Sequence, residues 1–199
     1  MRRLVLATTN NGKVVELRKL LKDLPYEVVG LPAYPGAPEV EETGSTFAEN
    51  AVLKAKAMAE YTGELTLADD SGLEVDALNG APGVFSARYG QPGWNDRQRY
   101  EYLLVKLAGT PLAERTARFR CAVALYDPSS GRLEQADGAV EGLILEAPRG
   151  SNGFGYDPLF LVPELNLTLS ELSADRKNEL SHRARAIQKI LPMLGQMAG

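Results

Sequence analysis

The apolar positions near the amino terminus predict a strand, a loop and a helix in that order. Residues 4–7 form a continuous apolar run, which is typical of a buried strand. The polar segment Thr8–Lys13 follows it. After that segment, Val14, Leu17 and Leu21 recur every three or four positions, which is the spacing of one helix face. A buried strand is therefore predicted to lead through a polar loop into an amphipathic helix.

A second helix and a second strand are predicted further along the chain. Thr46 and Glu49 have the spacing of a capping box, in which two side chains satisfy free backbone amides at a helix start. Gly63 is suited to end that helix in a left-handed conformation. The apolar residues Leu65–Ala68 then predict a short buried strand that ends before Asp69.

The second half of the chain favours hairpin strands and a last helix. Apolar and polar residues alternate over 117–121, and a turn at 127–131 leads to a return strand at 133–145. An apolar stripe predicts one last helix from about Asp175 to Leu194. Early helices and later hairpin strands together predict an α/β fold, a mixed sheet with helices on its faces.

The composition narrows the class of protein. The chain has 199 residues, of which 44% are hydrophobic, enough for a globular domain with a sizeable core. Its net charge of -4 argues against a nonspecific binder of nucleic acid or of a membrane surface, because both need a basic excess. No apolar run is long enough to cross a bilayer. The one cysteine, Cys121, forms no internal disulfide, which indicates a cytoplasmic setting with the thiol buried as a small hydrophobe.

Two adjacent carboxylates, Asp69 and Asp70, follow the predicted strand and precede Ser71 and Gly72. Neighbouring like charges repel, so each carboxylate needs a partner of its own. A divalent cation that bridges them to a phosphate would hold them. Since the chain has one Cys and one His, oxygen ligands and magnesium are indicated. The alternative is a polar turn without a ligand, because Asp-Asp-Ser-Gly is also good turn chemistry.

The Thr8–Lys13 segment offers donors for a phosphate. A helix N-terminus has free N–H groups, and the Thr hydroxyls, the Asn amides and Lys13 add further donors. A cation is unfavourable against the helix dipole at this end, which favours a bound anion over a plain turn capped by asparagine. The segment is not a Walker A loop, because Ala7 and Val14 depart from that motif.

A third unusual segment is Gly153-Phe154-Gly155-Tyr156-Asp157. An aromatic ring between two glycines suits stacking on a nucleobase, because the backbone can come close on both sides. The alternative is a bulge or tight turn that buries Phe154.

These segments together resemble the Ham1-like family of inosine and xanthosine triphosphate pyrophosphatases over about residues 4–190. Thr9 stands where many members have glycine. The markers occur along the chain in the family's order: Thr8, Asn10 and Lys13; Glu41-Glu42-Thr43-Gly44; Phe47, Glu49, Asn50 and Ala51; Asp69-Asp70-Ser71-Gly72-Leu73; Gly80-Ala81-Pro82-Gly83; Ser86-Ala87-Arg88-Tyr89; Gly153-Phe154-Gly155-Tyr156-Asp157-Pro158; and Ser181-His182-Arg183.

The resemblance implies a single Ham1-like nucleotide pyrophosphatase domain over residues 1–199. Its fold would be an elongated mixed sheet flanked by helices, with two lobes and a cleft between them. The implied reaction is Mg²⁺-dependent hydrolysis of non-canonical purine triphosphates (dITP, ITP and XTP) to the monophosphate and pyrophosphate, which clears them from the nucleotide pool. A cytoplasmic homodimer is implied as well.

The resemblance also assigns roles to residues. Asp70 is expected to be the catalytic base, and Asp70 with Glu41, or alternatively Glu42, to hold Mg²⁺. Phe154 is expected to stack on the base, whose edge Asp157, Lys177, His182 and Arg183 would contact. The loop, Ser71 and Lys54 would lie at the triphosphate. The expected substrate-binding residues are Thr8, Thr9, Asn10, Asn11, Gly12, Lys13, Ser71, Phe154, Gly155, Tyr156, Asp157, Lys177, His182 and Arg183.

Two alternatives to this function stay open. The first is a Maf-like pyrophosphatase of related fold that acts on other nucleotides. The second is a nucleotide-binding module without turnover. The adjacent carboxylates argue against the second alternative, because binding a phosphate does not call for added negative charge unless a metal is present.

Overall fold

The structure is a computed structural model that describes residues 1–197, and it divides into two compact units. Unit 1 combines residues 1–70, 121–138 and the chain from 183 onward. Unit 2 combines residues 71–120 and 139–182. Each unit is thus assembled from segments that are distant in the sequence. Within the described part of the chain, no helix has both the length and the apolar character needed to cross a membrane.

Helices and strands alternate through the first half of the chain, as the apolar pattern predicts. The strands are β1 (Arg2–Leu6), β2 (Tyr26–Gly30), β3 (Leu65–Val75), β4 (Thr116–Asp127), β5 (Arg132–Ile144), β6 (Phe160–Val162) and β7 (Leu167–Thr168). The α-helices are α1 (Asn11–Leu20), α2 (Phe47–Thr62), α3 (Asp96–Lys106), α4 (Ala174–Leu180) and α5 (His182–Met197). Short 3-10 helices lie at Leu31–Ala33, Asp76–Leu78, Gly83–Arg88 and Leu112–Glu114.

The strands form one mixed sheet in the order β2-β1-β3-β4-β5-β6-β7. β1 pairs in parallel with β2 and β3, whereas β6 pairs antiparallel with β5 and β7. The parallel part belongs to unit 1 and results from helical crossovers between its strands. The predicted α/β fold with a mixed sheet is therefore confirmed.

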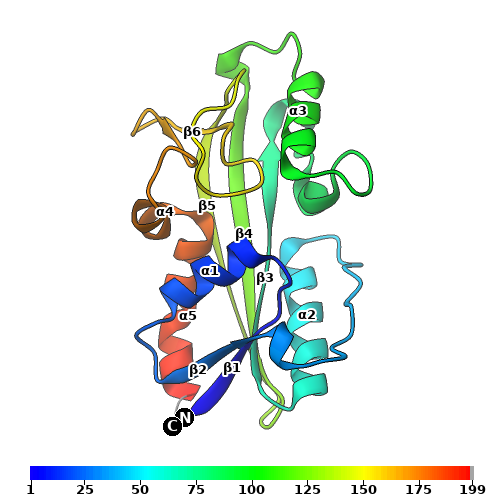
Figure 1. Cartoon of the computed structure of the whole chain (residues 1–199), viewed down its shortest axis with the longest axis vertical. Coiled ribbons are helices and arrows are strands. Elements are labelled where there is room, and N and C mark those ends of the chain that lie inside the picture. Colours follow the sequence, from blue (N-terminus) through cyan, green and yellow to red (C-terminus); the bar gives the residue numbers. More distant parts are fainter. Residues whose placement is uncertain (198–199) are drawn as a thin grey trace. The chain divides into compact units, whose positions relative to one another are not determined.

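In unit 1, helices cover both faces of the strands. Alternate residues of the strands, such as Leu4 and Leu67, pack with Leu17 of α1 and with Ile187 and Leu194 of α5 in one core. α2 contributes none of its residues to that core and lies on the other side of β1 and β3, as Figure 1 shows. The capping box that starts α2 and the left-handed glycine that ends it are both present where the sequence predicts them.

In unit 2, a separate core holds α3 and the glycine-rich segment against the strands. Leu103 of α3 and Leu107, which follows the helix, pack with Leu73 of β3. The rings of Phe119 and Phe160 meet with their centroids 4.7 Å apart. This core fixes the positions of the ends of α3 and of the segment around Phe154.

The strand predicted over Leu65–Ala68 is too short. β3 continues without a break through Asp69 and Asp70 to Val75, so the acidic pair lies inside a strand and not in a turn. Asp69 and Asp70 are compatible with a continuous strand, because a helix of unit 1 supplies a partner for each carboxylate.

The single helix predicted from Asp175 to Leu194 is also wrong. Two helices, α4 and α5, meet at Ser181, whose backbone is extended (φ -65°, ψ 159°). The apolar stripe spans both helices, so spacing alone did not reveal the break. As a consequence, Lys177 belongs to unit 2 and Arg183 to unit 1.

Candidate active site

The two adjacent aspartates of β3 point to opposite faces of the sheet. Side chains alternate along a strand, so Asp69 shares its face with Leu65 and Leu67, which pack against α1 and α5. Asp70 faces the other way, toward α2, where it meets Asn50. The strand thereby separates two like charges that are neighbours in sequence and gives each carboxylate a different environment.

Asp69 is fully buried and holds two cations. Its Oδ2 lies 3.0 Å from Nζ of Lys13 and 3.2 Å from Nε of Arg183. Arg183 is also buried, and its guanidinium forms a second ion pair with Glu16. Burial alone would raise the pKa of Asp69, but Lys13, Arg183 and Lys54 outweigh it and keep that pKa below the ordinary value. Asp69 is therefore ionised, and it fixes Lys13 at the start of α1.

The pKa of Asp70 is shifted in the opposite direction to that of Asp69. Burial raises the pKa of its carboxyl above the ordinary value, the charge of Glu42 adds to this effect, and Lys54 opposes it. Nζ of Lys54 lies 3.7 Å from Oδ1 of Asp70 and 2.6 Å from Oε1 of Glu42. Burial lowers the pKa of Lys54, but the carboxylates Asp69, Asp70 and Glu42 outweigh it, so that pKa is raised. Two carboxylates thus converge on one ammonium group.

Asn50 connects Asp70 to the loop that carries Glu42. Its side-chain amide donates to Oδ2 of Asp70 at 3.1 Å, and its Oδ1 accepts the N–H of Gly44 at 2.7 Å. A side chain at position 44 would bring its Cβ to 2.6 Å from that oxygen, so glycine is required there. The sequence reasoning gave Asn50 no contact to Asp70. The signal in the sequence was the spacing of Asn50, three residues after Phe47 and eight before Met58, which places a polar residue on the apolar face of α2.

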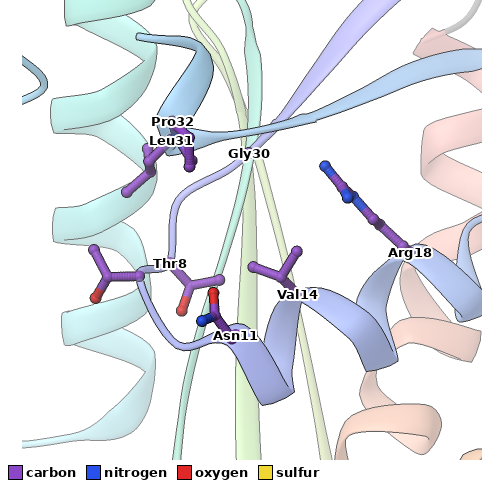
Figure 2. Close-up of a pocket in the computed structure, with 8 residues that line it drawn as sticks. Thr8, Asn11, Val14, Arg18, Gly30, Leu31 and Pro32 are labelled. Atoms are coloured by element: carbon purple, nitrogen blue, oxygen red, sulfur yellow. The ribbon is translucent and has the colours of Figure 1, made fainter. Parts of the chain in front are cut away.

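The loop after β1 has the geometry predicted for the start of a helix. The side chain of Asn10 caps α1 by accepting the N–H of Lys13 at 3.1 Å, and Thr8 Oγ1 accepts the N–H of Asn10 at 3.2 Å. A cavity of about 390 Å³ lies between this loop and the end of β2 (Figure 2). Its lining residues are Thr8, Thr9, Asn11, Val14, Arg18, Gly30, Leu31 and Pro32.

Unit 2 brings together the residues predicted at the base. Nζ of Lys177 forms an ion pair with Oδ2 of Asp157, and both side chains are buried. The same ammonium lies 4.6 Å from the centroid of the Phe154 ring, within cation–π range. Phe154 itself is half-buried, so part of its ring remains accessible. The segment consists of bends and turns, as the alternative to a stacking site predicts, but it leaves Phe154 only half-buried.

The remaining predicted residues of unit 2 are held by packing. The ring of His182 stacks on Phe119 with centroids 4.9 Å apart and planes 12° apart. Tyr156 is buried, donates its hydroxyl to the carbonyl of Ser86 at 2.7 Å, and has a raised pKa because of burial. Ser71 is half-buried in β3.

Two predicted residues have environments that the sequence did not indicate. Arg183 forms ion pairs with Asp69 and Glu16 of unit 1, whereas Lys177, Asp157 and His182 belong to unit 2. Glu41 is exposed, and it is Glu42 that shares Lys54 with Asp70. Cys121 is buried as expected, and burial raises the pKa of its thiol to about 12, so it is not a nucleophile.

Asp70 and Glu42 fit a magnesium site. Mg²⁺ is usually held by one or two carboxylates, with water and substrate phosphates as the other ligands. Within residues 1–197 no group of three or more His, Cys, Asp or Glu side chains is arranged to hold a metal, so the protein alone supplies an incomplete set. Burial is the main cause of the raised pKa of Asp70, and a cation bound at this carboxylate would favour its ionised form.

The fold and this residue set define an α/β protein whose charged side chains gather at the carboxyl ends of parallel strands, where such folds bind phosphate-containing ligands. The chain belongs to the Ham1 family, whose sequence profile matches residues 4–193. The "dITP/XTP pyrophosphatase" of Desulforamulus reducens is 53% identical over 195 residues, covering 98% of this chain and 96% of the relative. The protein of the same name from Gloeobacter violaceus is 56% identical over 192 residues, covering 96% of this chain and 93% of the relative.

Solved structures agree with this membership. A HAM1 protein from Coxiella burnetii superposes with a TM-score of 0.89 at 42% identity, covering 98% of this chain and all of that one (100%). The Staphylococcus aureus Ham1 protein superposes with a TM-score of 0.87 at 41% identity, with the same coverage of 98% and 100%. The family resemblance in the sequence is thus confirmed.

Proposed function

We propose that the chain is a Mg²⁺-dependent pyrophosphatase that hydrolyses dITP, ITP and XTP to the monophosphate and pyrophosphate. The observation that carries this proposal is the difference between the surroundings of Asp69 and Asp70 on β3. Asp69 is compensated by Lys13 and Arg183, whereas Asp70 is buried on the opposite face beside Lys54, and burial and Glu42 raise its pKa. A binding protein for phosphate would not need Asp70, but a metal-assisted hydrolase does.

The triphosphate is bound by unit 1. The N-terminal amides of α1, the side chains of Thr8, Asn10 and Asn11, and the ammonium groups of Lys13 and Lys54 supply donors and positive charge. Asp70 and Glu42 hold Mg²⁺, which when bound draws charge from the phosphates and helps to form the pyrophosphate leaving group. Glu41 stays an alternative ligand.

Asp70 acts as the general base. Its raised pKa brings its basicity closer to what proton abstraction from water requires, and Asn50 keeps the carboxylate oriented by donating to Oδ2. The proton of the attacking water passes to the carboxylate of Asp70 as the water oxygen forms a bond to the α-phosphorus. The P–O bond to the pyrophosphate breaks, and the monophosphate remains.

The purine is bound by unit 2. Phe154 stacks on the base, with Gly155 and Tyr156 continuing the platform, and Lys177, Asp157 and His182 contact its edge. Hypoxanthine and xanthine carry an acceptor oxygen at position 6, whereas adenine carries a donor. Donors from Lys177 and His182 therefore favour the first two bases, and pockets of this type can discriminate by roughly 10⁴-fold. Arg183 contributes by holding Asp69.

The wider setting follows from the same residues. In this proposal, residues 1–199 form one catalytic domain. The buried thiol of Cys121 suits a cytoplasmic enzyme. A homodimer is part of this proposal.

The test is a product assay over a panel of nucleoside triphosphates. We expect ITP, dITP and XTP to release pyrophosphate at rates at least about 10²-fold above ATP, and chelation of Mg²⁺ to abolish turnover. The released anion is identified as pyrophosphate or orthophosphate by a coupled assay with and without an inorganic pyrophosphatase. Orthophosphate as the first product would contradict cleavage between the α- and β-phosphates.

The same panel separates the alternatives. A Maf-like specificity would appear as pyrophosphate release from pyrimidine or modified-base triphosphates with little from ITP. A binding module would bind ITP by calorimetry, with or without Mg²⁺, and release no product.

A further inference from the structure

The segment that carries Phe154 is held by α3 as well as by its own side chains. The backbone N–H of Gly155 donates to Oδ2 of Asp96 at 2.8 Å, across 59 positions of the sequence. Asp96 is the first residue of α3, and the capping box of Asn95 and Gln98 fixes the start of that helix. The carboxylate that accepts the N–H of Gly155 therefore belongs to the fixed first turn of α3.

Two consecutive amides in this segment are paired with carboxylates. The N–H of Phe154 donates to Oδ2 of Asp157 at 3.0 Å, and the next N–H, that of Gly155, donates to Asp96. Gly153 and Gly155 both have positive φ angles, 78° and 62°. A Cβ at position 153 would lie 2.2 Å from the Asp157 carboxylate. Successive amides in such a conformation form an anion-binding concavity, here filled by the protein's own carboxylates.

The two carboxylates have different roles. Asp157 is already engaged by Lys177, whose ammonium lies over the Phe154 ring. Asp96 accepts the N–H of Gly155 and lies 3.7 Å from the guanidinium of Arg99, and its charge helps to raise the pKa of Tyr156. Its hydrogen bond orients the peptide that joins Phe154 to Gly155, and that peptide sets the direction in which the ring leaves the backbone.

We propose that Asp96 is a positioning residue for nucleobase binding, which fixes the Phe154 ring in its stacking orientation through the amide of Gly155. This inference rests on the proposed function, in which Phe154 stacks on the purine. A carboxylate at the first turn of a helix also stabilises the helix dipole. The test must therefore distinguish base binding from helix stability.

The experiment compares Asp96→Ala with Gln98→Ala in the full-length protein. Gln98→Ala removes the other half of the capping box and destabilises the start of α3 without touching Gly155. Calorimetry with inosine monophosphate measures base binding without turnover. We expect Asp96→Ala to weaken that Kd about tenfold, the usual size for a lost charge-assisted hydrogen bond, and Gln98→Ala to change it less than about twofold.

One further variant and two further measurements test whether the effect is specific to the hydrogen bond between Asp96 and Gly155. Asp96→Asn keeps an acceptor oxygen and should stay within about threefold of the wild-type Kd. The inhibition constant of inorganic tripolyphosphate, which has no base, should be the same in all variants. In an amide NMR spectrum, the Gly155 resonance should shift in Asp96→Ala and stay in place in Gln98→Ala.

The outcomes separate this inference from the proposed function. An unchanged Kd for inosine monophosphate in Asp96→Ala, or equal weakening in Gln98→Ala, would overturn the role of Asp96. Absence of ITP hydrolysis by the wild type would overturn the proposed enzyme, and the Kd comparison would still decide whether Asp96 positions a base-binding segment. If the wild type does turn over ITP, the KM of Asp96→Ala for ITP should rise together with its Kd for inosine monophosphate. The kcat of Asp96→Ala should stay within about twofold of the wild-type value.

Discussion

Replacing Asp70 by asparagine is expected to lower kcat for ITP by about 10³-fold or more, because one carboxylate serves as general base and as metal ligand. Asparagine has nearly the same shape and keeps an oxygen that can accept from Asn50, so the surrounding geometry is retained. Binding of ITP in the absence of Mg²⁺ should change little. The loss should thus appear in turnover and not in nucleotide affinity.

The same substitution is expected to leave the metal-free protein equally stable or more stable. The pKa of Asp70 is raised by burial, so its protonated form favours the folded state below the ordinary carboxyl pKa. That contribution is lost as the pH rises through the raised pKa, and at pH 8 the buried, ionised carboxylate of Asp70 destabilises the folded state. A neutral side chain avoids this cost. We expect the Tm of Asp70→Asn at pH 8 without metal to rise by about 2–4 °C.

Asp76→Asn is the matched control. Asp76 is exposed and lies 3.0 Å from Arg118, and its hydrogen bond with Arg118 lowers its pKa. Its replacement should not raise Tm and should leave kcat unchanged. The measurements are thermal unfolding with a chelator present and pyrophosphate release with Mg²⁺. More than a tenth of wild-type turnover in Asp70→Asn, or a Tm lowered by several degrees, would contradict the role assigned to Asp70.

The acidic pair shows what the sequence could and could not predict. The residue types indicated that each carboxylate needs its own partner, and the structure confirms this. Continuation of β3 through the pair was not predicted, because it depends on Lys13, Arg183 and Asn50, which come from three different helices. The local sequence pattern identifies turn-forming residues, but it does not reveal the ion-pair and hydrogen-bond partners that the tertiary structure supplies.

Helix starts were predicted well because their signals are local. The box formed by Thr46 and Glu49 lies where the sequence places it. The break at Ser181 was missed, since an apolar stripe continues across it. That break explains why Arg183 pairs with Asp69 while Lys177 pairs with Asp157, although the two cations are close in sequence. The resemblance assigns Lys177 and Arg183 to the same edge of the base, whereas the structure gives the two cations different carboxylate partners.

Asp69→Asn is expected to have the largest effect on stability. Asp69 is the buried carboxylate between Lys13 and Arg183, and Arg183 is itself fully buried. Removing one partner of a buried ion pair leaves an uncompensated charge, which costs about 3–5 kcal/mol. We expect urea unfolding at pH 7 to report a loss of this size and Tm to fall by about 10 °C. Because Lys13 loses its anchor, KM for ITP should rise as well.

The pH dependence of this loss has a definite sign. The pKa of Asp69 is held below its ordinary value of 3.8, so its contribution to stability is complete above that pH and declines as the pH falls toward the lowered pKa. The difference between wild type and Asp69→Asn should be greatest at pH 7 and should shrink below about pH 4.

Asp127→Asn supplies the comparison for Asp69→Asn. Asp127 pairs with Arg2 at 2.8 Å and has a pKa lowered to about 2, but Arg2 is partly exposed, so water replaces the lost partner. Its loss should be about 1 kcal/mol. A double variant, Asp69→Asn with Arg183→Met, should recover part of the stability lost in Asp69→Asn, because it removes the uncompensated cation. Equal losses in Asp69→Asn and Asp127→Asn, or no recovery in the double variant, would show that Asp69 does not hold the buried charges of unit 1 together.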